Sequence, residues 1–161
     1  MGALATTMSQ GRDGDAGRPG GWLRTGDVGC LDEDGYLYLQ GREDDVINRG
    51  GEKVYPREIE EILLEDPRVI DAVVIGLDDE SLGQVPVAYL TIREVLDRSD
   101  TQQALLVGQD AMGRLSEMLP KGKRPASLHV VPGLPTTATG KLLRHPRGSV
   151  GSDTIVTLPG R

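Results

Sequence analysis

Three short segments of the sequence place charged residues beside glycines, so they are the first candidates for binding an anionic substrate. They are residues 21–27, which end in Asp27, residues 41–54, which contain Gly50 and Gly51, and residues 135–144, which contain Lys141. A glycine followed by lysine also occurs in P-loops, which bind phosphate. A P-loop would need glycine at position 135 and serine or threonine at position 142. This sequence has proline and leucine there, so a P-loop is excluded.

Each segment taken alone also has a simpler interpretation. Asp27 can belong to a solvated turn, and Lys141 can be a surface lysine. Gly50 and Gly51 can form a bend, because glycine is the usual residue where φ is positive. His129 and His145 have no serine or aspartate placed to form a catalytic triad with them.

The composition excludes several classes of function. The 161 residues include 18 basic and 25 acidic side chains, for a net charge of −7, so no broad cationic field can hold a nucleic acid or an anionic membrane. With a single cysteine and two histidines, neither an internal disulfide nor a metal site is expected. No segment approaches the roughly 20 apolar residues of a membrane span, and no signal-peptide run is present. We therefore expect a soluble, cytoplasmic protein with one modest core.

The spacing of apolar residues predicts the elements that must position the three segments. It predicts a β-hairpin over 28–40, a helix from Pro56 to Asp66-Pro67, antiparallel strands over 69–77 and 85–92, a helix from Ser99 to Leu119, and a third strand over 127–131. Gly108 and Gly113 weaken the second helix by up to ~1 kcal/mol each relative to alanine. A lone hairpin is marginal in water, so we expect the ribbon over 28–40 to be exposed and mobile. Helices segregated from a three-stranded sheet make an α+β fold.

Together the three segments resemble the end of an AMP-forming synthetase, of the superfamily of acyl-CoA synthetases, peptide-synthetase adenylation domains and luciferases. The shared motifs are Arg-Thr-Gly-Asp ending at Asp27, Gly-Arg-x-x-Asp through Pro-x-Glu-Ile-Glu over 41–60, and Pro-x-x-x-x-Gly-Lys-x-x-Arg around Lys141. The resemblance runs from about Trp22 to Arg144. It implies a small C-terminal lid domain that follows a large adenylation domain.

The resemblance also implies a role for individual residues in the adenylation step. Asp27 would accept hydrogen bonds from the two ribose hydroxyls of ATP or AMP, since a carboxylate offers several lone pairs, and Arg42 would touch the same ribose. Asp44 would be the hinge about which the lid rotates between two half-reactions. Lys141 would be catalytic, reaching the substrate carboxylate and the α-phosphate.

In the second half-reaction, the resemblance implies that the 48–53 loop replaces Lys141 at the reacting centre. The residues along the approach of the coenzyme A thiol would be Asn48, Arg49, Gly50, Gly51 and Glu52, and Lys53 would contact the AMP phosphate. Arg49, Lys121, Lys123 and Arg124 are also candidates for binding coenzyme A phosphates, although each can instead be a solvated surface charge.

The family's large N-terminal domain has no counterpart in residues 1–21. The resemblance therefore divides the chain into a disordered lead-in (1–21), a remnant of the large domain (22–43), the lid (44–145) and a flexible tail (146–161).

Two hypotheses follow from this division. In the first, the chain is the lid of a fatty or other acyl-CoA synthetase, and it acts on ATP with Mg²⁺, a carboxylic acid and coenzyme A once a separately encoded N-terminal part completes it. In the second, it is a free-standing interaction domain or an inactive gene fragment. Under the first hypothesis the acid is chosen by the large domain.

Overall fold

The protein is described from a computed structural model, which covers residues 25–93, 101–136, 138 and 154–160. The chain divides into two compact units, Met1–Val46 and Ile47–Arg161, and each has a sheet of its own. The border between the two units lies three residues after residue 43, where the resemblance implied that the remnant of the large domain ends. The predicted lead-in of residues 1–21 lies outside the described residues.

The first unit contains the predicted hairpin. Strand β1 (Asp27–Leu31) pairs antiparallel with β2 (Leu37–Arg42), and the helical turn η1 (Glu43–Asp45) follows. Asp32 closes the connection, because its Oδ1 accepts the backbone N–H groups of Asp34 at 3.0 Å and Tyr36 at 2.8 Å. The large side chains of Leu31, Tyr36, Leu37, Tyr38 and Leu39 are exposed, as expected, and the mobility of the ribbon stays a prediction.

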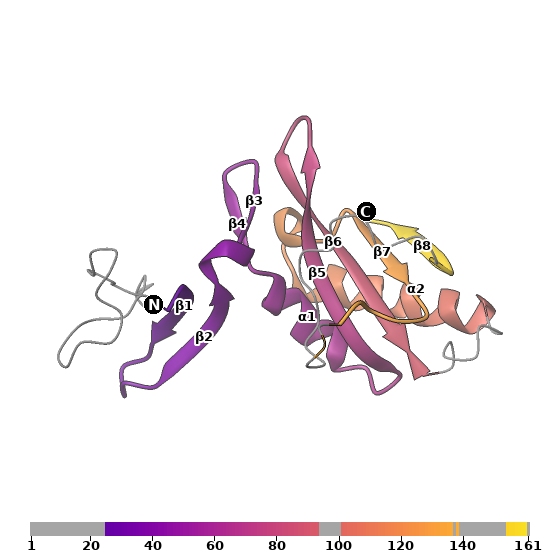
Figure 1. Ribbon diagram of the computed structural model, residues 1–161, viewed down its shortest axis with the longest axis horizontal. Helices are drawn as coiled ribbons and strands as arrows, with labels where there is room; N and C mark the ends of the chain where they lie inside the picture. Colours follow the sequence, from indigo (N-terminus) through magenta and orange to yellow (C-terminus); the bar gives the residue numbers. More distant parts are fainter. Residues whose placement is uncertain (1–24, 94–100, 137, 139–153, 161) are drawn as a thin grey trace. The chain divides into compact units, whose positions relative to one another are not determined.

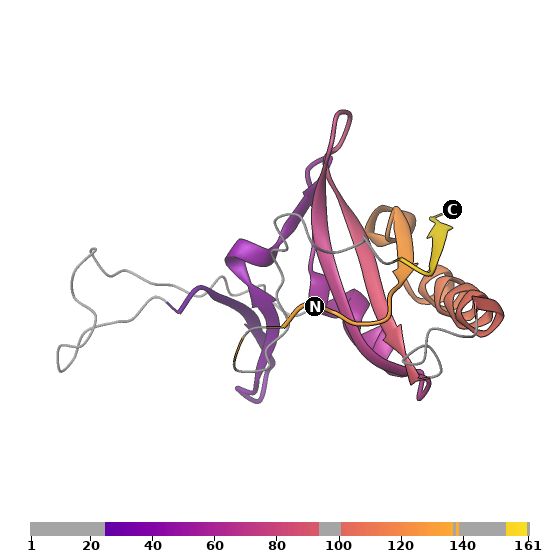
Figure 2. The same ribbon diagram turned by 45° about the vertical axis from the view of Figure 1, so that its right-hand side comes forward.

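The second unit is one mixed sheet with two helices on one face (Figures 1 and 2). Its strands are β3 (Ile47–Arg49), β4 (Glu52–Val54), β5 (Val69–Asp79), β6 (Gly83–Ile92), β7 (Ser127–Val130) and β8 (Val156–Pro159). The helices are α1 (Pro56–Leu64) and α2 (Thr101–Met118), and the short turn η3 (Lys121–Lys123) follows α2. Strand β6 is central, since it pairs antiparallel with β5 and β3 and parallel with β7. The predicted α+β class is confirmed.

The sheet is larger than the three strands that the sequence predicted. Those three are present as β5, β6 and β7, and β3, β4 and β8 add to them. The prediction of a flexible tail over 146–161 is wrong for Val156–Pro159, which pairs antiparallel with β7. This strand forms because the edge of β7 offers unpaired backbone groups and because Leu158 has a place to pack. A methyl group on Gly108 of α2 would collide with Leu158.

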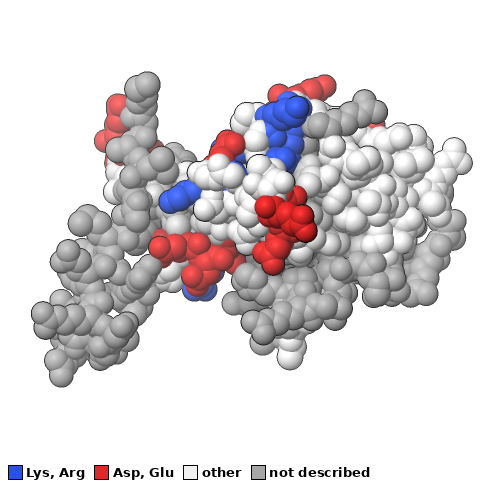
Figure 3. Space-filling view, turned by 90° about the horizontal axis from the view of Figure 1, so that it is seen from above, with Lys and Arg blue, Asp and Glu red and all other residues white. Residues whose placement is uncertain are grey.

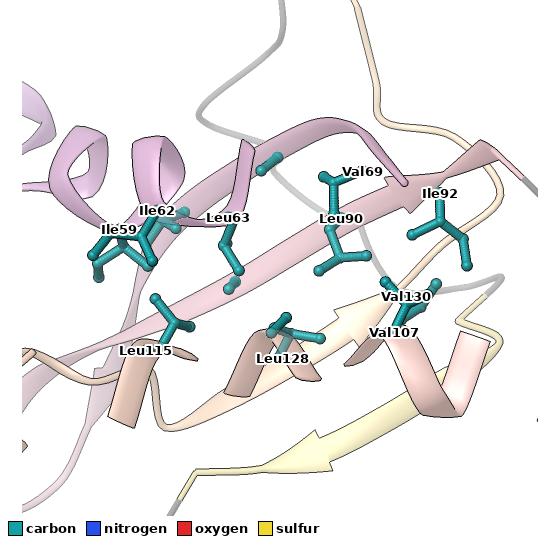
Figure 4. Close-up of a cluster of buried hydrophobic side chains, with 14 of the residues drawn as sticks. Ile59, Ile62, Leu63, Val69, Leu90, Ile92, Val107, Leu115, Leu128 and Val130 are labelled. Atoms are coloured by element: carbon teal, nitrogen blue, oxygen red, sulfur yellow. The ribbon is translucent and has the colours of Figure 1, made fainter. Parts of the chain in front are cut away.

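Both helices bury one apolar side against the sheet. Figure 4 shows Ile59, Ile62 and Leu63 of α1 and Val107 and Leu115 of α2 facing apolar side chains of the strands. Helix α1 begins at Pro56 as predicted, where a missing N–H leaves no intrahelical bond unmade. The predicted start of the second helix, Ser99, lies outside the described residues.

The opposite face of the sheet carries a second, smaller apolar cluster. It consists of Val73, Val87, Tyr89 and Val131, with Ile75 and Leu134 packed against it. Residues 131–136, which follow β7, run along this face (Figure 2). No helix within the described ranges is long and apolar enough to cross a membrane.

Candidate functional site

The structure places the two predicted ribose-binding residues directly opposite each other. Asp27 and Arg42 form the first pair of the β1–β2 ladder, so their side chains emerge on the same face of the ribbon. Gly26, with φ at +75°, turns the chain into β1, and its carbonyl accepts the N–H of Glu43 at 2.7 Å. This end of the ribbon therefore presents a carboxylate and a guanidinium side by side.

The predicted hinge, Asp44, lies in η1, which follows β2 and precedes β3 along the chain. This element is one short turn of 3₁₀ helix. The N–H of Val46 closes it by donating to the carbonyl of Glu43 at 3.3 Å. The first compact unit ends at Val46. Asp44 thus lies two residues before the end of the first unit, and its role as a hinge stays a prediction.

The predicted thiol-approach loop is a tight hairpin between β3 and β4. Its two-residue turn, Gly50-Gly51, has φ values of +58° and +89°. Positive φ at both central positions is the requirement of a type I′ turn, which glycine meets without strain. The N–H of Gly51 also donates to Asn48 Oδ1 at 3.1 Å. The glycine pair thus has the positive φ angles that the sequence suggested. They occur in a two-residue turn, not in the longer loop that was expected.

The turn between β5 and β6 holds this hairpin from one side. Gly50 N–H donates to the carbonyl of Leu82 at 2.7 Å, and Asn48 N–H donates to Gln84 Oε1 at 3.1 Å. Leu82 is in turn held by Asp79, whose Oδ1 accepts its N–H at 2.9 Å. Gly50 and Leu82, like Asn48 and Gln84, are more than thirty residues apart in the sequence, which contains no local signal for these contacts.

The 120–124 turn, which includes η3, holds the same hairpin from another side. Arg49 Nη1 donates to the carbonyls of Gly122 at 2.9 Å, Arg124 at 3.0 Å and Lys121 at 3.3 Å. A methyl group on Gly122 would collide with the carboxylate of Glu52, so the hairpin and the turn are in close contact. Sequence reasoning did not find this contact.

Two other candidate phosphate-binding cations also have protein partners. Lys123 Nζ pairs with Glu58 at 2.8 Å. Arg124 donates to the carbonyl of Ser116 in the last turn of α2 at 2.7 Å and to that of Leu119, just after the helix, at 2.9 Å, where a cation is favoured by the helix dipole. Lys53 and Lys121 are exposed. Figure 3 shows both signs of charge on the face in view.

The Pro-x-Glu-Ile-Glu motif has a structural explanation. Glu58 binds Lys123, and Ile59 is fully buried in the main core. Glu60 is 5% exposed, and its Oε1 accepts the N–H of Val74 in β5 at 2.9 Å. The motif therefore joins α1 to the 120–124 turn and to the sheet.

Lys141, the predicted catalytic residue, lies outside the described residues. Of its segment the structure describes residues 135, 136 and 138. Among the side chains that can be placed, no group of three His, Cys, Asp or Glu could hold a metal ion.

His129 has hydroxyl partners that the sequence analysis did not identify. Its Nε2 lies 2.9 Å from Ser127 Oγ and its Nδ1 lies 3.0 Å from Thr157 Oγ1, and its ring stacks on Tyr89. The two-residue spacing on β7 could have indicated Ser127, but Thr157 comes from the unpredicted strand β8. Burial lowers the pKa of His129. Because a threonine stands where a triad needs a carboxylate, this cluster does not form a hydrolytic triad.

Comparisons with known proteins agree with this architecture. Residues 58–141 match the family described as AMP-binding enzyme C-terminal domain. A 2-succinylbenzoate–CoA ligase from Bacillus licheniformis is 40% identical over 125 residues, which cover 78% of this chain and 24% of that protein. The o-succinylbenzoate CoA synthetase from Bacillus subtilis, solved with an acyl-adenylate intermediate, is 39% identical, with a TM-score of 0.65 over 83% of this chain and 26% of that one.

A Mycobacterium tuberculosis fatty acyl CoA synthetase has the same fold over the matched region. It is 34% identical, with a TM-score of 0.58 over 78% of this chain and 23% of that one. The chain thus spans about a quarter of the length of the relatives that it matches.

Proposed function

The chain belongs to the family of AMP-binding enzyme C-terminal domains, and from this premise we propose that it is the lid of an ATP-dependent, AMP-forming acid–thiol ligase. A large adenylation domain completes the active site, either on a separate chain or on additional sequence. The observation that carries the proposal is the family match over residues 58–141, which begins within the Pro-x-Glu-Ile-Glu motif, at Glu58, and ends at Lys141.

The first half-reaction makes an acyl-adenylate. A carboxylate oxygen attacks the α-phosphorus of ATP, which is bound with Mg²⁺ as a substrate, and pyrophosphate leaves. Negative charge builds up on the phosphate oxygens, and the Lys141 ammonium stabilises that charge in a site from which water is excluded. Asp27 accepts hydrogen bonds from the ribose hydroxyls, with Arg42 beside it. Their pairing across the ribbon supports this role.

The second half-reaction transfers the acyl group. The lid rotates about Asp44, the thiol of coenzyme A attacks the acyl carbonyl, and AMP leaves. The type I′ turn at Gly50-Gly51 brings two residues without side chains to the tip of the hairpin, so a slender pantetheine arm can pass close to the backbone. Glu52 borders this path, and Lys53 contacts the AMP phosphate.

The substrate class is a carboxylic acid with coenzyme A. The relative from Bacillus licheniformis is named as a 2-succinylbenzoate–CoA ligase, and the relative from Mycobacterium tuberculosis is named as a fatty acyl CoA synthetase. The lid is shared between them, which supports the proposal that the acid is selected by the large domain.

A fusion protein tests the proposed function. The chain replaces the matched quarter of the Bacillus subtilis synthetase, and ATP–pyrophosphate exchange is measured with 2-succinylbenzoate. We expect exchange in the fusion and a fall of about 10²- to 10³-fold in Lys141→Ala. Arg57→Ala is the matched control, since Arg57 is an exposed cation paired with Glu61 on α1. A folded fusion without exchange, or equal rates in the Lys141 and Arg57 variants, would refute the proposal.

A further inference from the structure

We propose that Arg49 is a positioning residue, which holds the 48–53 hairpin in one shape through the 120–124 turn, and that it is not a contact for coenzyme A. Its effect on catalysis rests on the function proposed above. Its effect on the shape of the hairpin does not.

The geometry at Arg49 favours a backbone anchor over a ligand contact. One nitrogen, Nη1, lies 2.9 to 3.3 Å from the carbonyls of Lys121, Gly122 and Arg124. Hydrogen bonds from a charged donor are stronger than those between neutral groups. A phosphate could recruit this nitrogen only if these bonds were lost, so binding there would compete with the fold.

The 120–124 turn is itself fixed, so it can act as an anchor. Lys123 pairs with Glu58 on α1, and Arg124 bonds to carbonyls at the end of α2. The turn therefore joins both helices. Through this turn, Arg49 fixes the position of the hairpin relative to both helices.

The hairpin is held from two sides, and one of the two contacts, that of Gly50, lies at its tip. The β5–β6 turn accepts the N–H of Gly50 at Leu82, and the 120–124 turn receives Arg49. The side chains of Glu52 and Lys53 remain exposed. A preorganised tip limits the wrong geometries available to an incoming thiol, and small misplacements can cost large factors in rate.

The exchange of arginine for lysine separates an anchor from a charge. Lysine keeps the positive charge but is a compact point donor without the planar fork of arginine. If Arg49 served to attract a coenzyme phosphate, Arg49→Lys would keep most of the activity that Arg49→Ala loses. If Arg49 is an anchor, both variants fail alike.

The first test is hydrogen exchange on the full chain. The amides of Gly50 and Gly51 report on the hairpin, because they donate to Leu82 and to Asn48. We expect both Arg49 variants to lose about tenfold in protection at these amides, with β6 unchanged. The matched control is Lys53→Ala, on the same hairpin, which should leave protection unchanged. Unchanged protection in the Arg49 variants would overturn the proposal.

The second test measures the two half-reactions separately in the fusion described above. Arg49→Lys and Arg49→Ala should each slow thioester formation from preformed adenylate by about tenfold or more, while pyrophosphate exchange stays within about twofold. Rescue by lysine, or a parallel fall of both half-reactions, would overturn the role of Arg49. A fusion inactive in both half-reactions would instead refute the proposed function, and hydrogen exchange would then decide the anchor alone.

Discussion

Asp66 gives a quantitative test of how the helical layer is joined to the sheet. It lies just after α1, is 3% exposed, and its Oδ2 accepts Arg68 Nη2 at 2.7 Å and Arg114 Nη2 at 3.1 Å. Arg68 also donates through Nε and its backbone N–H to Asp66 Oδ1, each at 3.0 Å. Because Arg114 belongs to α2, a single carboxylate links the α1–β5 connection to the second helix.

The size of the effect follows from the pKa. Hydrogen bonds from Arg68 lower the pKa of Asp66 from 3.8 to about 2, against the opposing effect of burial. At about 1.4 kcal/mol per pKa unit, the folded state gains roughly 2 kcal/mol from the charged form. Because the folded pKa is the lower one, this stabilisation is fully present above about pH 4 and is lost as the pH falls towards 2, with roughly half remaining at pH 3.

Asp66→Asn removes this charge and keeps the shape of the side chain. We expect the free energy of unfolding at pH 7 to fall by about 2 kcal/mol or more, since two arginines lose a buried partner. The control is Asp110→Asn, which removes an exposed partner of the same Arg68 and should cost less than about 1 kcal/mol.

Urea unfolding of the full chain, followed by circular dichroism at pH 7 and pH 3, measures both quantities. The difference between the wild type and Asp66→Asn should shrink by about 1 kcal/mol at pH 3. A difference that is equal at both pH values, or equal costs for the Asp66 and Asp110 variants, would refute the reasoning.

Two further predictions concern α2 and β5. Gly113→Ala should stabilise the protein by up to ~1 kcal/mol, because glycine is a poor helix former and nothing lies near the new methyl group. Gly108→Ala should not stabilise it, because the methyl group displaces Leu158. Thermal unfolding compares the two variants, and in a Leu158→Ala background Gly108→Ala should become stabilising. Glu60→Leu should lower the free energy of unfolding by about 1–3 kcal/mol, because the buried N–H of Val74 loses its acceptor. Glu60→Gln keeps an acceptor oxygen and should lower it less. Equal urea midpoints for the two variants would contradict this explanation.

Local signals in the sequence were sufficient for several elements. Alternation around the Asp32 turn predicted the hairpin, Pro56 predicted the start of α1, and Gly50-Gly51 indicated positive φ. Each of these depends on residues that are close in the chain, where propensity and turn chemistry act directly. The apposition of Asp27 and Arg42 is a consequence of the hairpin register, so it too was within reach of the sequence.

The contacts between distant segments could not be read in the same way. Strand β8 was missed because Val156–Pro159 is too short to indicate a strand without the edge that it covers. The β3–β4 hairpin was interpreted as a loop, since its charges gave no apolar alternation. Arg49, Lys123 and Arg124 looked alike as surface cations. Their partners distinguish them, since Arg49 and Arg124 bond to backbone carbonyls and Lys123 pairs with the carboxylate of Glu58.

The sequence by itself determined the class of the fold, its two helices and three of its sheet strands, and the family, because periodicity and motifs depend on neighbouring residues. Only the tertiary structure decided which charges hold the lid together. A hydrogen bond such as that from Arg49 to Gly122 needs donor and acceptor within about 3 Å. Segments more than seventy residues apart reach that distance only when the whole sheet and both helices have packed.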